Sequence, residues 1–215
     1  MRYTSVLFDL DGTLLDTLGD LTAAMNRTLT RHGLPERTRQ QMRAALGNGA
    51  RRLMELSVPT GTDSALFETL LAEYNADYAA HCRIETAPYP GVAALLRALH
   101  AQGCKLAIVS NKPDEAVRAL RADFFAGAVP IAVGETAAIR RKPAPDMLLA
   151  AMEQLGADPA GTVFVGDSEV DIATARAAGL PCISVLWGFR DRDVLERAGA
   201  QQFAADAGEL ARLLD

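Results

Sequence analysis

SVLFDLDGTLLD, residues 5–16, runs from a short apolar stretch directly into two carboxylates and a glycine. Asp9 and Asp11 are two positions apart, so a continuing strand would place both side chains on one face of a sheet. Gly12 permits the backbone to turn there, because it lacks the Cβ that resists such a turn. Carboxylates crowded at a strand end repel each other unless they share a proton or a cation, and Mg²⁺ suits oxygen ligands. The stretch therefore predicts an acidic, metal-assisted site after the first strand.

The rest of the chain has the rhythm of a parallel sheet. From residue 89 onward, short runs rich in Val, Ile and Ala alternate with amphipathic segments. This alternation predicts an α/β fold, a Rossmann-like parallel sheet with helices on both faces. The expected strands are Ser5–Phe8, Lys105–Ser110, Val129–Val133, Thr162–Val165 and Pro181–Val185, and the expected helices are Val92–Gln102, Asp114–Ala122, Asp146–Leu155 and Asp171–Ala178.

Residues 16–87 break this rhythm, because they contain no convincing strand and at least two helical patterns. We therefore expect an inserted all-helical cap domain at 16–87, and an α/β core domain made of residues 1–15 and 88–215. The Pro- and Gly-rich return at residues 88–91 is typical of a hinge. One of the helical patterns consists of Phe67, Leu70, Leu71, Tyr74 and Tyr78.

A second acidic motif, VGDSEVD at residues 165–171, follows another expected strand. It places Asp167 on a loop and Asp171 one turn into a helix, where both can ligate one ion directly or through water. An acidic first helical turn is also a routine cap. Because two acidic motifs end two strands of one sheet, the pair favours a metal site over a cap alone.

Two further motifs supply partners for a phosphate. IVSNK at residues 108–112 ends a strand with Ser110 and Asn111, which offer hydroxyl, amide and backbone donors, although such residues also start ordinary turns. RKPAPD at residues 141–146 presents Lys142, one of three lysines in the chain, from a proline-stiffened loop. The alternative for Lys142 is a solvated surface charge. Since sites in open parallel sheets form at the carboxyl ends of strands, the four motifs together predict phosphoryl transfer.

Composition excludes several other classes of function. With 22 Lys+Arg against 27 Asp+Glu, the net charge of −5 has the wrong sign for a nucleic-acid partner. Three widely spaced cysteines without a CxxC pair predict neither disulfides nor a zinc site. The sequence has no apolar run long enough to predict a membrane span or a signal peptide. We therefore expect a cytoplasmic protein without a membrane partner.

The order and spacing of DLDGT, VSN, RKPAPD and GDSEVD resemble the four motifs of the haloacid dehalogenase-like superfamily, over essentially the whole chain. The helical insertion resembles that superfamily's cap. The resemblance implies a Mg²⁺-dependent reaction through an aspartyl-phosphate. In it, Asp9 is the nucleophile and Asp11 is the general acid and then the general base.

The same resemblance implies the ligands of phosphate and metal. Ser110 and Lys142 bind phosphate, with Thr13 and Asn111 as secondary candidates. Mg²⁺ is held by Asp9, the backbone carbonyl of Asp11, and Asp167, with Asp171 nearby as a further candidate ligand.

Differences between this sequence and members of the superfamily with other activities exclude two reaction types. Dehalogenating members lack the second aspartate of the first motif, so Asp11 argues against dehalogenation. Phosphonate-cleaving members need a cap lysine, and residues 16–87 contain none. Three alternatives remain, namely phosphomonoester hydrolysis, a β-phosphoglucomutase-like transfer on sugar phosphates, and a catalytically silent module that binds a phospho-ligand.

The cap segment LGNGARRLMEL, residues 46–56, bears on the substrate. Backbone N–H donors around Asn48, with Arg51 close by, can bind a substrate carboxylate. The alternative is an ordinary helix start with solvated arginines, which has the same sequence pattern. This segment and SVLWGFRDRDVLERAGAQQF, residues 184–203, resemble phosphoglycolate phosphatases. The expected partner is therefore a small phosphate ester such as 2-phosphoglycolate, bound by a monomer or homodimer.

Overall fold

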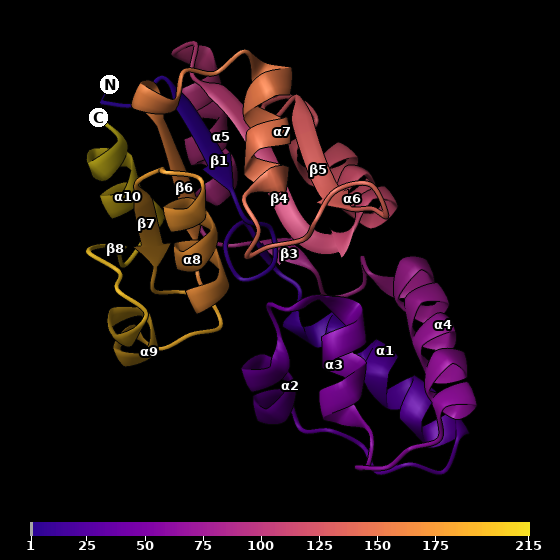
Figure 1. Ribbon diagram of the computed structural model, residues 1–215. Helices are drawn as coiled ribbons and strands as arrows, with labels where there is room; N and C mark the ends of the chain where they lie inside the picture. Colours follow the sequence, from indigo (N-terminus) through magenta and orange to yellow (C-terminus); the bar gives the residue numbers. More distant parts are fainter. Residues whose placement is uncertain (1) are drawn as a thin grey trace. The chain divides into compact units, whose positions relative to one another are not determined.

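The computed structural model describes residues 2–215, and the chain divides into two compact units (Figure 1). One unit comprises Met1–Leu15 and Pro88–Asp215, and the other comprises Asp16–Ala87. The chain passes between them at β2 (Leu15–Asp16) and β3 (Ala87–Pro88), which form a two-stranded sheet.

The first unit is built on a six-stranded parallel sheet with the order β5-β4-β1-β6-β7-β8. Its strands are β1 (Ser5–Phe8), β4 (Lys105–Pro113), β5 (Ile131–Glu135), β6 (Thr162–Gly166), β7 (Cys182–Val185) and β8 (Gln202–Ala204). From β1 at the centre, the chain adds β4 and β5 on one side of the sheet and then β6, β7 and β8 on the other. Strand order therefore reverses at β1, where sites in such sheets open. The expected Rossmann-like fold class is confirmed.

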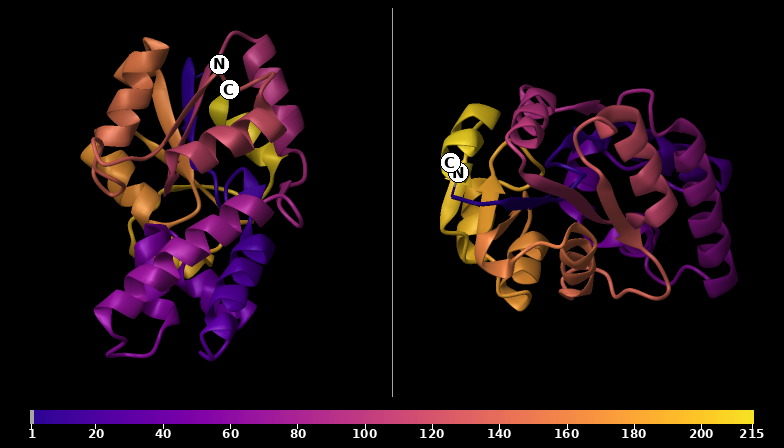
Figure 2. Two further views of the ribbon diagram at one scale, coloured as in Figure 1. Left: turned by 90° about the vertical axis from the view of Figure 1, so that its right-hand side faces the viewer. Right: turned by 90° about the horizontal axis from the view of Figure 1, so that it is seen from above.

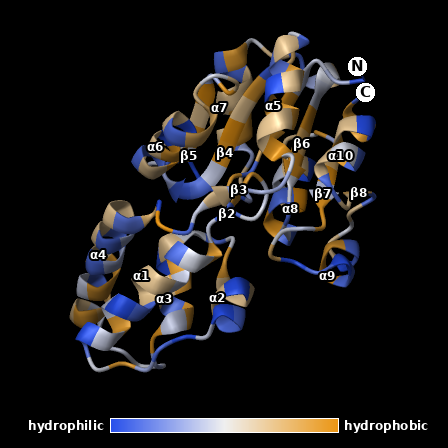
Figure 3. Cartoon of the chain, turned by 180° about the vertical axis from the view of Figure 1, so that it is seen from behind, coloured by the Kyte–Doolittle hydropathy of each residue, from blue (hydrophilic) through white to orange (hydrophobic). Residues whose placement is uncertain are grey.

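Helices cover both faces of this sheet. They are α5 (Val92–Ala101), α6 (Asp114–Phe125), α7 (Asp146–Leu155), α8 (Glu169–Ala177), α9 (Arg192–Arg197) and α10 (Ala207–Leu214), with a 3₁₀ turn at Pro159–Gly161. Figure 1 shows α7 and α8 in front of the sheet and α5 and α6 behind it. Leu7 lies beside Ala107 and Phe164 in adjacent strands, and these three join the apolar residues of α7 in one buried core. The central strands are correspondingly hydrophobic in Figure 3.

Several element boundaries differ from those expected. β4 continues past Ser110 to Pro113, so the polar residues Asn111 and Lys112 also belong to the strand. α8 begins at Glu169, two residues earlier than predicted, because Ser168 supplies its N-terminal cap. β8, α9 and α10 were not predicted, since each is short and only part of each is buried.

The second unit consists of helices, as expected for residues 16–87. They are α1 (Leu18–Arg31), α2 (Arg39–Ala45), α3 (Gly49–Ser57) and α4 (Ser64–His81). The predicted apolar stripe of α4 is buried at Leu70, Tyr74 and Tyr78. Asp20 of α1 is also buried, and its carboxylate accepts hydrogen bonds from the backbone N–H groups of residues 84–86. That carboxylate therefore fixes the returning chain against α1.

The two ends of the chain lie side by side in the first unit (Figure 2). The backbone N–H of Arg2 donates to the carbonyl of Leu214 at 3.1 Å. All three cysteines are free thiols. Among residues 2–215, the structure contains no helix with the length and apolar character needed to cross a membrane.

Candidate active site

Asp9 begins the site at the carboxyl end of β1. Its backbone N–H donates to the carbonyl of Val165 at 2.8 Å, which continues the pairing of β1 with β6 for one more residue. The chain then turns at Gly12, whose φ is 81°. A Cβ at this glycine would overlap the carboxylate of Asp167, so the first motif can pack against the second acidic motif only with glycine here.

Lys142 lies between two buried carboxylates. Its Nζ is 2.7 Å from Oδ1 of Asp9 and 2.7 Å from Oδ1 of Asp171. Burial alone would lower the pKa of Lys142, but the charges of Asp171 and Asp9 outweigh it and raise that pKa above its ordinary value. Lys142 is therefore a fixed, buried cation in contact with Asp9, not a surface charge.

Asp9, Asp167 and Asp171 form an acidic cluster in which one carboxylate oxygen of each lies within 4.8 Å of the others. Burial raises the pKa of Asp9, Lys142 opposes the rise, and the charges of Asp171 and Asp167 add to it. Burial, with the charge of Asp171, raises the pKa of Asp167 to about 7. Carboxylates whose ionised forms are this disfavoured gain from a shared cation, and an all-oxygen donor set suits a hard ion. The residues present therefore fit Mg²⁺.

Asp167 is oriented by groups from two distant segments. Its Oδ2 accepts a 2.6 Å hydrogen bond from the backbone N–H of Phe189, and its Oδ1 accepts from the Thr13 hydroxyl at 3.4 Å. The indole N–H of Trp187 donates to the carbonyl of Thr13 at 3.0 Å. A Cβ on Gly188 would overlap Asp167 and the carbonyl of Gly12. Sequence reasoning could not select Phe189, because a backbone donor leaves no signal in residue type.

Asp171 serves both the helix and the site. Its Oδ2 accepts hydrogen bonds from the backbone N–H of Ser168 at 3.1 Å and from the Ser168 hydroxyl at 2.6 Å, which closes the cap of α8. Its Oδ1 accepts from Lys142 at 2.7 Å. Each oxygen of Asp171 therefore has a partner within the chain, and the cap and the site use the same side chain.

Ser110 and Asn111 reach the site from the end of β4, and both are buried. The Asn111 amide donates to the carbonyl of Lys142 at 3.0 Å and accepts from its backbone N–H at 2.8 Å. Asn111 thus fixes the loop that presents Lys142. The Ser110 hydroxyl oxygen accepts from the backbone N–H of Lys112 at 3.3 Å.

Lys112 pairs with the second carboxylate of the first motif, although sequence reasoning did not select it. Its Nζ lies 3.1 Å from Oδ2 of Asp11, and the lysine is buried. The available signal was its place in the IVSNK motif in a chain with so few lysines.

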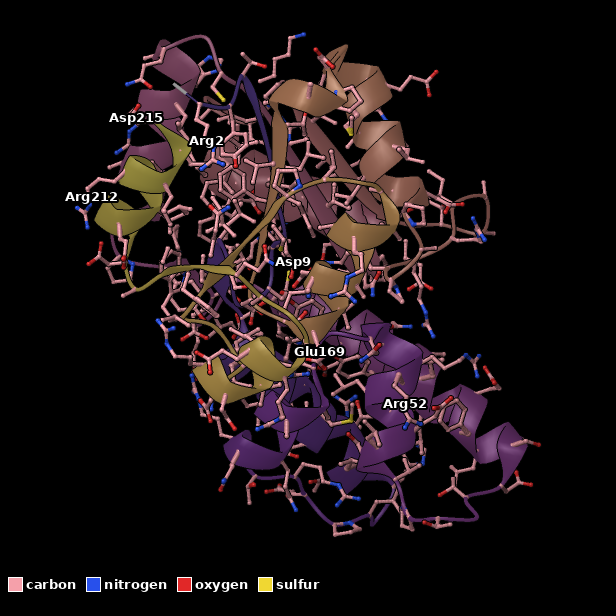
Figure 4. The ribbon with its side chains drawn as sticks, turned by 60° about the vertical axis from the view of Figure 1, so that its left-hand side comes forward. Arg2, Asp9, Arg52, Glu169, Arg212 and Asp215 are labelled. Atoms are coloured by element: carbon pink, nitrogen blue, oxygen red, sulfur yellow. The ribbon has the colours of Figure 1, made fainter. Side chains whose placement is uncertain are left out.

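The contacts above form two groups in the first unit. One links Asp9, Thr13, Asn111, Lys142, Asp167 and Asp171, and the other links Asp11, Ser110 and Lys112. Figure 4 marks Asp9 at the end of β1 and Glu169 at the start of α8.

The two candidates in the helical unit have other surroundings. Arg51 pairs with Glu68 through two hydrogen bonds of 2.8 Å and lies over the ring of Phe67, 5.3 Å from its centroid. Asn48 precedes α3, and its side chain makes no capping hydrogen bond there. Their role in binding substrate stays a prediction.

Comparison with known proteins agrees with this arrangement. The family model for haloacid dehalogenase-like hydrolases matches residues 6–185. A phosphoglycolate phosphatase of Xanthomonas campestris pv. campestris is 36% identical over 192 residues, which are 88% of this chain and 86% of that protein. An N-acetylmuramic acid 6-phosphate phosphatase of Pseudomonas aeruginosa is 34% identical over 217 residues, which are 100% of this chain and 96% of that protein. The crystal structure of a provisionally named phosphoglycolate phosphatase from Lactobacillus delbrueckii subsp. bulgaricus superposes with a TM-score of 0.94, at 35% identity, over 100% of this chain and 99% of that one.

Proposed function

Since this chain belongs to the haloacid dehalogenase-like hydrolases and its curated relatives are phosphatases, we propose that it hydrolyses phosphate monoesters with Mg²⁺ through an aspartyl-phosphate on Asp9. The observation that supports this most is the 2.7 Å contact of buried Lys142 with Asp9, beside the acidic cluster. This contact supports Asp9 as the nucleophile, because a fixed cation lies against it beside the carboxylates that can hold a metal.

The reaction takes two steps. A carboxylate oxygen of Asp9 attacks phosphorus in line while the bond from phosphorus to the leaving oxygen breaks, and protonated Asp11 gives its proton to that oxygen. Asp11, now ionised, accepts a proton from the water that attacks the aspartyl-phosphate. Inorganic phosphate leaves, Asp9 is restored as a carboxylate, and Asp11 is protonated again.

The neighbouring residues bind and orient. Lys142 and Ser110 hold the phosphoryl oxygens, and Asp171 holds Lys142 in place. When bound by Asp9, the carbonyl of Asp11, and Asp167, Mg²⁺ supplies further stabilisation of the phosphoryl charge. Thr13 and Asn111 fix Asp167 and the Lys142 loop respectively.

For the substrate we favour a small phosphorylated acid, 2-phosphoglycolate. The names of several relatives support it. Asn48 and Arg51 of the helical unit are the candidates for the substrate carboxylate. N-Acetylmuramic acid 6-phosphate is the second candidate, because the relative of that name aligns with this chain over its whole length.

Phosphate release tests this proposal. The purified protein is assayed with 2-phosphoglycolate, N-acetylmuramic acid 6-phosphate and glucose 1-phosphate, with and without EDTA. We expect release from an acidic ester, lost on chelation and in Asp9→Asn. Asp193→Asn, at an exposed ion pair on α9, is the matched control and keeps the wild-type rate. Turnover by Asp9→Asn would exclude the covalent route, and conversion of glucose 1-phosphate without phosphate release would indicate a mutase.

A further inference from the structure

The site contains a second buried cation that the proposed reaction does not use. Only 5% of the Lys112 side chain is exposed, and its Nζ lies 3.1 Å from Oδ2 of Asp11. Lys142, by contrast, contacts Asp9. The two lysines therefore contact different carboxylates. Lys142 contacts the proposed nucleophile, and Lys112 contacts the proposed general acid, Asp11.

The backbone holds Lys112 at this place. β4 pairs regularly with β5 up to Val109 and Val133, and again at Pro113 and Glu135, so three residues of β4 stand opposite one residue of β5. That one residue is Gly134, where a Cβ would overlap the backbone of Asp114 and the carbonyl of Lys112. The bulge and the glycine opposite it thus form a local structure that carries Lys112 into the site.

The chemistry follows from the partner of Lys112. Because Asp11 protonates the leaving oxygen, the leaving group must come within hydrogen-bond distance of the Asp11 carboxyl. An ammonium group 3.1 Å from that carboxyl then lies beside the first atoms of the leaving group. A buried ammonium forms its strongest hydrogen bonds with an anion, and a carboxylate one carbon from the ester oxygen is within reach.

We propose that Lys112 is a specificity-determining residue, which binds a carboxylate carried by the leaving group next to the ester oxygen. This inference rests on the proposed phosphatase function and deepens it. It assigns selection of small acids phosphorylated on the 2-hydroxyl group to Lys112 at the end of β4, in addition to any selection by the helical unit. N-Acetylmuramic acid 6-phosphate, whose carboxylate is many bonds from its phosphate ester, gains nothing from this contact.

The test compares two esters of nearly equal size, 2-phosphoglycolate and its neutral counterpart 2-hydroxyethyl phosphate. In Lys112→Met we expect the ratio of their kcat/KM values to fall roughly 10- to 100-fold, the loss of one charge-assisted hydrogen bond. Lys112→Arg keeps the charge and retains most of the preference. Lys105→Met, at the opposite end of the same strand where Lys105 bonds the carbonyl of Gly156, is the matched control and leaves the ratio unchanged.

Each other outcome overturns the inference. An equal loss for both esters would mean that Lys112 only positions Asp11, while the phosphatase function stands. Failure of the wild type to hydrolyse either ester would overturn this inference and 2-phosphoglycolate as the substrate, and failure on N-acetylmuramic acid 6-phosphate as well would remove the proposed function. If Lys112→Met does not fold, inhibition of the wild type decides, with 2-hydroxyethyl phosphate as substrate. Glycolate is expected to inhibit at least 10-fold more strongly than ethylene glycol, and equal inhibition would refute the carboxylate contact.

Discussion

The ammonium group of Lys142 lies 2.7 Å from a carboxylate oxygen of Asp9, and both side chains are buried. In the proposed reaction an anionic phosphate approaches an anionic nucleophile, which requires positive charge already in place, and this contact would provide it before the substrate arrives. Because the Asn111 amide bonds both backbone polar groups of Lys142, the lysine is held from its main chain as well as from its side chain.

Replacement of Lys142 by methionine is expected to lower kcat about 10²- to 10³-fold, because phosphoryl charge loses its fixed donor. It is also expected to destabilise the protein by about 3–5 kcal/mol, since two buried carboxylates lose their counter-charge. Phosphate release and urea unfolding measure the two effects. Lys105→Met is again the control, and Lys142→Met with wild-type kcat would show that Lys142 serves stability alone.

Substitutions of Asp171 and Asp167 are expected to differ in their effect on the Mg²⁺ dependence of the reaction. Asp171→Asn disturbs the grip on Lys142 and should lower kcat about 10- to 100-fold, with a much smaller change in the Mg²⁺ concentration for half-maximal rate. Asp167→Asn removes a proposed ligand, and it should raise that Mg²⁺ concentration more than about 100-fold. Titration of each variant with Mg²⁺ distinguishes them. A larger metal effect in Asp171→Asn would instead make Asp171 a direct ligand.

Much of this architecture could be predicted from local patterns. β1 at Ser5–Phe8 and α7 at Asp146–Leu155 have the limits expected, because each has a clear apolar pattern and a clear stop. Gly156 ends α7 in the left-handed conformation, which glycine adopts readily at a helix C-terminus. The convergence of the four motifs also followed from their positions, since parallel strands end at one edge of the sheet.

The parts that could not be predicted depend on contacts between distant segments. The N–H of Phe189 bonds Asp167 across 22 positions of the chain, and any residue but proline offers such a donor. Lys112 enters the site through a bulge that exists only once β5 lies beside β4. The short strand β8 becomes a strand through its pairing with β7, because its three residues carry too little pattern of their own.

Gly188→Ala tests the packing behind the metal set. The added methyl group would overlap the side chain of Asp167 and the carbonyl of Gly12, so Asp167 must shift. We expect Mg²⁺ to bind about 10- to 100-fold more weakly, as when groups that orient metal ligands are changed. Gly127→Ala is the matched control, because a Cβ there meets no atom within 4 Å. Calorimetric titration with Mg²⁺ checks both variants, and unchanged affinity in Gly188→Ala would show that Asp167 is not a ligand.

Asp77 makes the stability of the helical unit depend on pH. It is buried on α4 and paired with Arg27 at 2.6 Å and Arg31 at 3.1 Å on α1. Burial alone would raise the pKa of Asp77, but these arginines and His81 outweigh it and lower that pKa below the ordinary 3.8. The folded state therefore binds this proton less readily than the unfolded state. The resulting stability is present above the unfolded pKa and is lost as the pH falls through the folded one.

Asp77→Asn removes this contribution and is expected to cost about 1.5–3 kcal/mol at pH 7, the value of hydrogen bonds to charged groups. The gap in urea midpoint between wild type and variant should close as the pH falls below 3.8 and through the lowered pKa of Asp77. Asp193→Asn, which removes an exposed ion pair, should show a small gap at every pH. A gap for Asp77→Asn that stays constant down to acid pH would mean that packing around the side chain, and not its charge, stabilises α4 against α1.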